Sequence, residues 1–166
     1  LIAYQTAYLK TYFKEEFIAS TMNTEKNNTT KLREFVDELK RLKVEVVRPN
    51  INECYNDFRT YENKILYGLG AVKNVGSEAV SNLIKERETN GKFKSLFDFI
   101  KRVDPKDINK LQLEGLVKAG AFDKLNSNRQ SIFNSIPNII KKSKNDFDNK
   151  SANQIDLFND TNENEI

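Results

Sequence analysis

The stretch that decides the fold is "LGAVKNVGSEAVSNLIKER", residues 69–87. It opens with apolar residues, breaks at Asn74, Val75 and Gly76, and then resumes with the period of a helix. The break places a small apolar residue between two turn-forming residues, and a good helix follows it at once. A plain turn between helices does not need an apolar residue at this position. The pattern therefore indicates a turn whose backbone binds a ligand.

Two short helices joined by a small-apolar-Gly turn, with Ala79 three residues later, are typical of a helix-hairpin-helix motif. The first amides of the second helix have no partner within the helix, and the positive end of the helix dipole lies there. A backbone phosphate fits at such a helix start. We expect Val75 to pack into the core, Gly76 to allow close approach, and Ser77 to add a hydroxyl or cap the helix. Contacts of this type read no base sequence.

The turn departs from the usual motif at Asn74, where glycine is common. Asparagine is the next best residue for a left-handed backbone, so the turn can form, although its side chain crowds the phosphate. Lys73 and Lys85 are expected to supply nearby positive charge. The alternative is a packing unit without a ligand, and the pattern alone favours the two interpretations equally.

A second and weaker copy of the motif is present in "LEGLVKAGAFDKL", residues 113–125. Its turn is centred on Gly120, and Lys118 and Lys124 flank it. A helix over residues 95–103 would link the two copies. Phosphate contact at Lys118 and Gly120 is one interpretation. The alternative, equally favoured, is that Gly120 only ends a helix.

The remaining segments predict a mainly α-helical fold with one small β-hairpin and a disordered C-terminal tail. The expected elements are a helix to about Met22, a helix capped by Thr29 or Thr30, an extended piece at 44–47, a hairpin at 57–68 that turns near Glu62 and Asn63, a short helix capped by Ser95, a helix that starts at Asp107 or Asn109, and a last helix that bends or ends near Pro137. From Lys141 onward the polar composition predicts disorder.

Composition excludes several classes of site. The 166 residues include 38% hydrophobic and 31% charged residues, and no stretch is long and apolar enough to span a membrane. There is no histidine and only one cysteine, Cys54, which excludes an internal disulfide, makes a zinc site very unfavourable and fits a reducing cytoplasm. No acidic cluster suggests a two-metal catalytic site, so we expect no catalytic and no metal-binding residues here. A net charge of +3 is a weak hint of a nucleic-acid partner.

Several strings, in order and at similar spacing, resemble the α subunits of bacterial DNA polymerase III, the C-family replicative polymerases. They are "AYQTAYLKTYFKEEFIASTMN", "VVRPNIN", "ILYGLGAVKNVGSEAVSNLIKER", "FKSLFDFIKRVD" and "LEGLVKAGAFDKLNSNR". The resemblance runs from Leu1 to about Arg129 and resumes at "QIDLF", residues 154–158. The chain has no initiator methionine, and we expect it to be a fragment of a longer product.

The resemblance implies a division into three parts. Residues 1–51 would form the end of a fingers-like helical region, residues 52–140 a tandem helix-hairpin-helix region that grips duplex DNA, and residues 141–166 a tail. The family's catalytic carboxylates lie upstream of this segment. The fragment would need no cofactor, whereas the longer parent would be a nucleotidyltransferase that uses magnesium.

The tail string resembles the peptide with which bacterial replication proteins bind the sliding clamp. In that resemblance, Gln154 makes polar contacts, Asp156 takes the middle position, and Leu157 and Phe158 enter an apolar pocket. The expected partners are duplex DNA, the sliding clamp and other polymerase subunits. Two alternatives stay open for the chain: a self-standing helix-hairpin-helix accessory protein of repair or recombination, and an interaction module whose hairpin has lost DNA contact.

Overall fold

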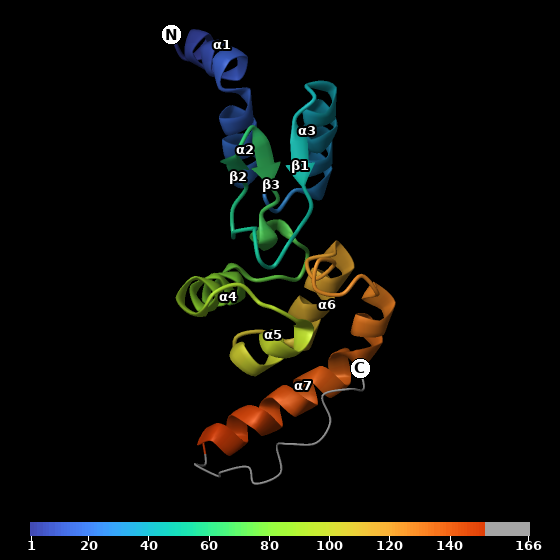
Figure 1. Cartoon of the computed structure of the whole chain (residues 1–166). Coiled ribbons are helices and arrows are strands. Elements are labelled where there is room, and N and C mark those ends of the chain that lie inside the picture. Colours follow the sequence, from blue (N-terminus) through green and yellow to red (C-terminus); the bar gives the residue numbers. More distant parts are fainter. Residues whose placement is uncertain (152–166) are drawn as a thin grey trace.

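The computed structural model describes residues 1–151, with the side chains up to residue 147, as a mainly helical chain with one small sheet (Figure 1). This confirms the predicted fold class. The elements are α1 (Ile2–Tyr12), α2 (Lys14–Thr24), α3 (Thr29–Arg41), β1 (Glu45–Val47), β2 (Arg59–Tyr61), β3 (Lys64–Leu66), the 3-10 turn η1 (Leu69–Ala71), α4 (Ser77–Asn90), α5 (Leu96–Arg102), α6 (Lys110–Ala119) and α7 (Arg129–Ser151).

The first predicted helix is two helices, because the backbone leaves the helical region at Phe13 (φ −134°, ψ 51°). Of the two, α2 buries side chains and α1 buries none, so the break lets α2 pack alone. The predicted cap of α3 at Thr29 or Thr30 is wrong. Asn28 precedes the helix in an extended conformation, and its side chain accepts a hydrogen bond from the Lys31 amide (3.1 Å).

The predicted hairpin is confirmed, and it turns at Glu62 and Asn63, both with positive φ (47° and 60°). Two successive left-handed residues are the conformation of the tight turns that suit the twist of antiparallel strands. The sequence missed that β1 pairs with β3 in parallel, Val46 opposite Ile65. The result is a three-stranded sheet in the order β1-β3-β2.

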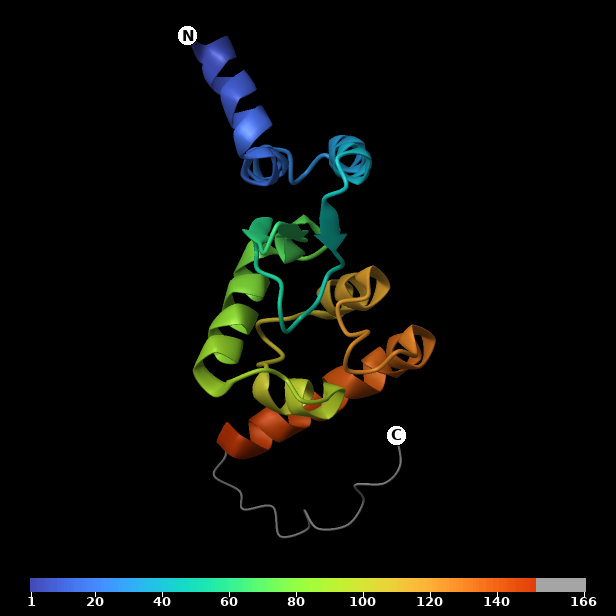
Figure 2. The same cartoon turned by 45° about the horizontal axis from the view of Figure 1, so that its top comes forward.

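This sheet separates two hydrophobic cores. Ile65 belongs to the core formed with α2 and α3, whereas its neighbour Leu66 belongs to the core of α4–α7. Successive residues of a strand point to opposite faces, which explains the split. Figure 2 shows the sheet between the N-terminal helices and the C-terminal helical group. The domain boundary expected at residues 51 and 52 stays a prediction.

The starts of α5 and α6 follow the predicted caps. The Ser95 hydroxyl accepts a hydrogen bond from the Asp98 amide (3.0 Å) at the start of α5. Asn109, rather than Asp107, caps α6 through a reciprocal pair of hydrogen bonds with Gln112. These caps fix where α5 and α6 begin and therefore how they present their apolar faces.

Of the two predicted alternatives at Pro137, the end of the helix is wrong, because α7 continues through this proline to Ser151, whereas a bend within α7 is visible in Figure 1. Disorder therefore does not begin at Lys141. Packing explains the difference: Ser143 is buried against α5, and its hydroxyl donates to the Ile100 carbonyl (3.3 Å). Residues 152–166 lie outside the described part of the chain.

Candidate nucleic-acid interface

Hairpin 1, residues 72–76 between η1 and α4, has the predicted arrangement, in which Val75 is buried and the rest of the turn is open. Val75 is 7% exposed and packs in the core, whereas Lys73, Asn74, Gly76 and Ser77 are exposed. The Val75 amide donates to the Val72 carbonyl (3.0 Å), which closes the turn. The turn thus presents its backbone to solvent while one side chain anchors it.

The backbone of hairpin 1 shows why its residue types fit. Asn74 has φ 67°, so the asparagine adopts the left-handed conformation that the sequence requires of it. Gly76 is extended (φ −76°, ψ 143°), so glycine is not needed there for its backbone freedom. A Cβ on Gly76 would approach only Nε2 of Gln112, at 3.2 Å. The absence of a side chain at Gly76 therefore keeps the surface of the turn open.

Gly76, not Ser77, is the N-cap of α4, and no side chain in the described part of the chain caps this helix. The predicted capping role of Ser77 is therefore wrong, although its exposed hydroxyl lies at the same place. The first amides of α4 point away from the helix without an intrahelical partner. Such a start attracts anions, because the positive end of the helix dipole coincides with these amides.

Hairpin 2, residues 120–128 between α6 and α7, is built differently. Gly120 is buried at φ 81° and forms the left-handed C-cap of α6. The Arg129–Asp123 ion pair covers it, since a Cβ on Gly120 would lie 2.8 Å from Asp123 Oδ2. The hydrogen bond from Arg129 holds the pKa of the Asp123 carboxyl below its usual value. This geometry is that of the C-cap alternative, and phosphate contact at Gly120 stays a prediction.

Comparison with known proteins agrees with the geometry of the two hairpins. The model of a family described as "Helix-hairpin-helix motif" matches residues 43–132. The chain belongs to this helix-hairpin-helix family.

The expected resemblance to polymerase α subunits is also confirmed. The chain is 44% identical to DNA polymerase III subunit alpha of Borreliella burgdorferi over 95% of its own length and 14% of the relative's. The corresponding subunit of Campylobacter jejuni is 41% identical, over 87% of this chain and 12% of the relative. That of Xylella fastidiosa is 39% identical, over 95% and 13%. The chain thus spans only 12–14% of the length of these curated relatives.

In this helix-hairpin-helix unit, the predicted basic residues differ in their surroundings. Lys85 lies along α4 about 12 Å beyond Ser77, at a rise of about 1.5 Å per residue. It lines a groove of about 410 Å³ with acidic residues of the α5–α6 connection, Asp104 and Asp107. Lys118 lies over the ring of Phe133, at 4.9 Å from its centroid. Of the predicted lysines, only Lys73 lies in hairpin 1.

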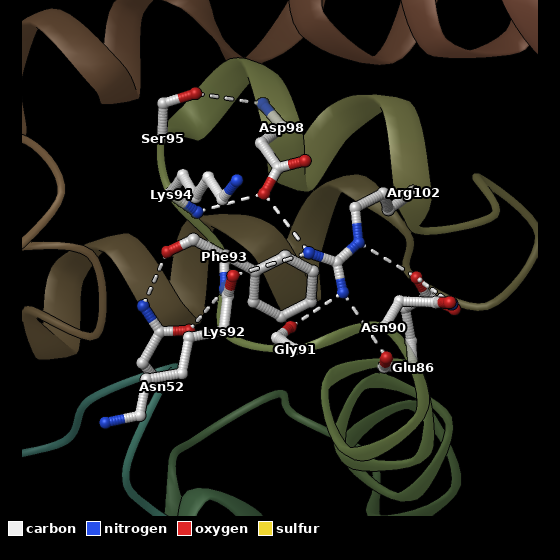
Figure 3. A network of polar contacts seen from close by, with 10 residues as sticks. All are labelled: Asn52, Glu86, Asn90, Gly91, Lys92, Phe93, Lys94, Ser95, Asp98 and Arg102. Atoms are coloured by element: carbon white, nitrogen blue, oxygen red, sulfur yellow. Dashed lines mark hydrogen bonds and ion pairs between the residues drawn. The ribbon is translucent and has the colours of Figure 1, made fainter.

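Other basic residues make contacts within the protein. Figure 3 shows the Arg102 guanidinium between the end of α4 and the start of α5. It donates to Glu86 (2.9 Å), to Asp98 (3.1 Å) and to the Gly91 carbonyl (2.8 Å). The ring of Phe93 lies against it, at 4.5 Å. This arginine holds the connection between the two helices, and its guanidinium is engaged within the protein.

Two residues of α6, Gln112 and Gly115, contact hairpin 1 and were missed by the sequence analysis. The one signal for them was a glycine in the middle of an otherwise regular helix.

Among residues 1–151, no helix is long and apolar enough to cross a membrane, and no cluster of three or more His, Cys, Asp or Glu side chains could hold a metal ion.

Burial raises the pKa of the Cys54 thiol, which keeps it protonated and poorly nucleophilic near neutral pH.

Proposed function

We propose that this chain is the part of a bacterial replicative polymerase α subunit that holds duplex DNA through its backbone phosphates during DNA replication. The observation that carries the proposal is hairpin 1, an open turn at an uncapped helix start. Its setting supports it, because polymerase relatives match nearly the whole chain. That coverage favours part of a polymerase over a self-standing accessory protein.

Catalysis would belong to the longer protein. The nucleotidyl transfer, its magnesium ions and the contacts with other polymerase subunits are proposed for that protein, which would work in the cytoplasm. The present segment would hold the duplex in position while nucleotidyl transfer occurs in another part of the longer protein. Because the contacts go to phosphate, the hold would be independent of base sequence, as a replicative enzyme requires.

The grip proposed for hairpin 1 uses its backbone more than its charges. A phosphate oxygen would accept hydrogen bonds from the first amides of α4, next to Gly76 and Ser77, with the Ser77 hydroxyl beside them. Lys73 is exposed at the other side of the turn and adds one positive charge. Glu78, also exposed in the first turn of α4, carries the opposite charge and would weaken the hold.

Gly76→Val is expected to weaken duplex binding about tenfold, corresponding to about 1.4 kcal/mol. The extended backbone of Gly76 accommodates any residue, and the valine side chain would stand beside the first amides of α4, where the phosphate approaches. Its Cβ would lie 3.2 Å from Nε2 of Gln112, which must move slightly. Lys73→Ala should lower the slope of log affinity against log salt by about one unit, because one counterion-releasing contact is lost. The measurement is fluorescence anisotropy with duplexes of unrelated sequence over a salt series.

Two variants control for charge alone. Glu78→Gln should strengthen binding, because it removes a negative charge at the same site. Lys31→Ala removes a positive charge on α3, where Lys31 is exposed and pairs with Glu34, and should leave the affinity unchanged. If Lys73→Ala and Gly76→Val together bind as the parent does at low salt, hairpin 1 is only a packing unit.

We further propose that residues 154–158 tether the chain to the sliding clamp. Leu157 and Phe158 would fill an apolar pocket, and Gln154 and Asp156 would make the polar contacts. These residues lie outside the described part of the chain, shortly after the end of α7 at Ser151. A short peptide binds weakly, but linkage to a DNA-bound polymerase raises its effective concentration at the clamp.

A synthetic peptide of residues 149–160 is expected to bind purified sliding clamp with a Kd in the micromolar range, roughly 8 kcal/mol at 1 μM. Changing both Leu157 and Phe158 to alanine should abolish this binding, since both apolar anchors are lost. Isothermal titration calorimetry with the two peptides decides the matter. Equal binding of the two peptides, or none by either, would remove the clamp from the proposed function.

A further inference from the structure

Gly115 occupies the middle of α6, where glycine is a poor choice. It lies within Lys110–Ala119, a helix with a reciprocal N-terminal cap and a left-handed C-cap. Its φ is not positive, since the positive-φ glycines of the described chain are Gly91 and Gly120. Alanine would suit an isolated helix better at this position. The reason for glycine must therefore lie in what α6 touches.

The three atoms nearest to a Cβ built on Gly115 belong to hairpin 1. A Cβ on Gly115 would lie 2.7 Å from the Lys73 carbonyl oxygen, 3.2 Å from Cγ2 of Val75 and 3.8 Å from Cγ1 of Val72. The first of these atoms is backbone, so no rotation of a side chain could relieve the contact. Hairpin 1 lies this close to α6 only because residue 115 has no side chain.

One turn earlier, Gln112 extends the same contact. Its Oε1 accepts a hydrogen bond from the Asn109 amide (2.8 Å), which fixes the direction of the side chain. Its Nε2 lies 3.2 Å from the position of a Cβ on Gly76. The N-terminal half of α6 therefore lies along hairpin 1, while its C-terminal end starts hairpin 2 at Gly120. A single helix supports both hairpins.

We propose that Gly115 is a positioning residue that seats hairpin 1 on α6. The seat, which is the contact of Gly115 with Lys73, Val75 and Val72, sets the direction in which the open backbone of hairpin 1 faces. It also holds the two hairpins of the tandem unit at a fixed separation. The effect on DNA binding rests on the proposed function. The seat itself is a property of the free protein, so the two can be tested apart.

The test is Gly115→Ala in the 166-residue chain. The added methyl group must displace the Lys73 carbonyl, so the Val75 amide, bonded to Val72, is expected to exchange its hydrogen at least about tenfold faster. Duplex affinity should fall about tenfold, and the salt slope should decrease by about one unit. Helix content by circular dichroism should stay the same or rise, because alanine is the better helix former.

Ala119→Gly is the matched control. It replaces alanine with glycine at the far end of the same helix, so it weakens α6 without placing a side chain between α6 and hairpin 1. Hydrogen exchange of the Val75 amide is expected to stay at the parent rate. Equal acceleration in the two variants would mean that hairpin 1 responds only to the stability of α6, and this would overturn the proposal.

The exchange measurement separates the two proposals. If hydrogen exchange of the Val75 amide is unchanged in Gly115→Ala, the positioning role of Gly115 is overturned, whatever the result of the DNA-binding measurement. Failure of the parent chain to bind DNA overturns the proposed function and leaves the exchange result to decide the seat. If Gly115→Ala does not fold, Val75→Ala removes part of the same contact from the side of hairpin 1. Faster amide hydrogen exchange in hairpin 1 with unchanged exchange in α6 supports the positioning role of Gly115. Unchanged exchange in both overturns it.

Discussion

Replacing Arg87 with alanine is expected to lower the free energy of unfolding by about 3 kcal/mol. Arg87 is 6% exposed on α4, and its Nη1 donates to the carbonyls of Ile51 (2.9 Å) and Cys54 (2.8 Å). Each of these acceptors would lose a buried partner, and a buried group left without a hydrogen bond costs about 1–3 kcal/mol. The guanidinium also lies over the ring of Tyr55, at 5.0 Å, and this packing is lost as well.

Urea denaturation followed by circular dichroism measures this loss, and Arg59→Ala is its matched control. The Arg59 guanidinium lies 3.9 Å from the centroid of the same Tyr55 ring, but Arg59 is exposed. A cation over a ring at an exposed site contributes about 0.5–1 kcal/mol. Arg87→Met keeps most of the apolar stem and should be as destabilising as alanine to within about 1 kcal/mol if the hydrogen bonds dominate. Equal losses for Arg59→Ala and Arg87→Ala would contradict this account.

The consequence concerns the way in which the two halves are joined. The segment that leads from β1 to β2 crosses from the N-terminal core to the C-terminal core and back, with Ile51 and Cys54 in one core and Phe58 in the other. Arg87 binds the middle of this crossing to α4. The Ile51 amide also donates to the Ala121 carbonyl in hairpin 2 (2.9 Å). The joint is thus attached to the same unit that carries both hairpins.

The features that the sequence predicted correctly depend on residues a few positions apart. The left-handed Asn74, the buried Val75, the Ser95 cap and the turn at Glu62 and Asn63 follow from local backbone preferences and local hydrogen bonds. The motif at residues 69–87 could therefore be recognised without knowledge of the rest of the fold.

The features that were missed depend on residues far apart in the sequence. Arg87 has its hydrogen-bond partners more than 30 residues away, and nothing in a helical pattern distinguishes such an arginine from an exposed one. The contact of Gly115 with Lys73 and the parallel pairing of β1 with β3 are of the same kind. The net charge, a weak hint of a nucleic-acid partner, likewise does not tell which basic residues are bound within the fold, as Arg87 and Arg102 are.

The predicted alternative in which the last helix ends near Pro137 was wrong for a related reason. Pro137 removes one amide from the helix, and the residues after it are polar, so local preference ends the helix there. Burial of Ile132 and Ile136 before the proline, and of Ser143 after it, stabilises the continuous helix instead. Tertiary packing outweighs a local preference that costs a few kcal/mol.

Phe99→Ala is expected to destabilise the protein by about 3–5 kcal/mol, the range for removing a buried aromatic ring. Phe99 is 2% exposed, and its ring contacts Phe93 edge to face (5.1 Å, 71°) and Phe122 in the same way (5.0 Å, 79°). Phe93 precedes α5 and Phe122 follows α6. The central ring therefore joins the connection between the hairpins to hairpin 2, and thermal or urea unfolding should show the full loss.

Phe97→Ala is the matched control, since it makes the same change on the same helix. Residues two positions apart on a helix lie about 200° apart around its axis, so Phe97 and Phe99 face opposite sides of α5. Phe97 is 40% exposed and contacts the ammonium group of Lys101, at 4.3 Å. Its loss should cost less than about 1 kcal/mol. A cost for Phe97→Ala equal to that for Phe99→Ala would mean that α5 presents a different face to the core, and the arrangement of the linker between the two hairpins would then be wrong.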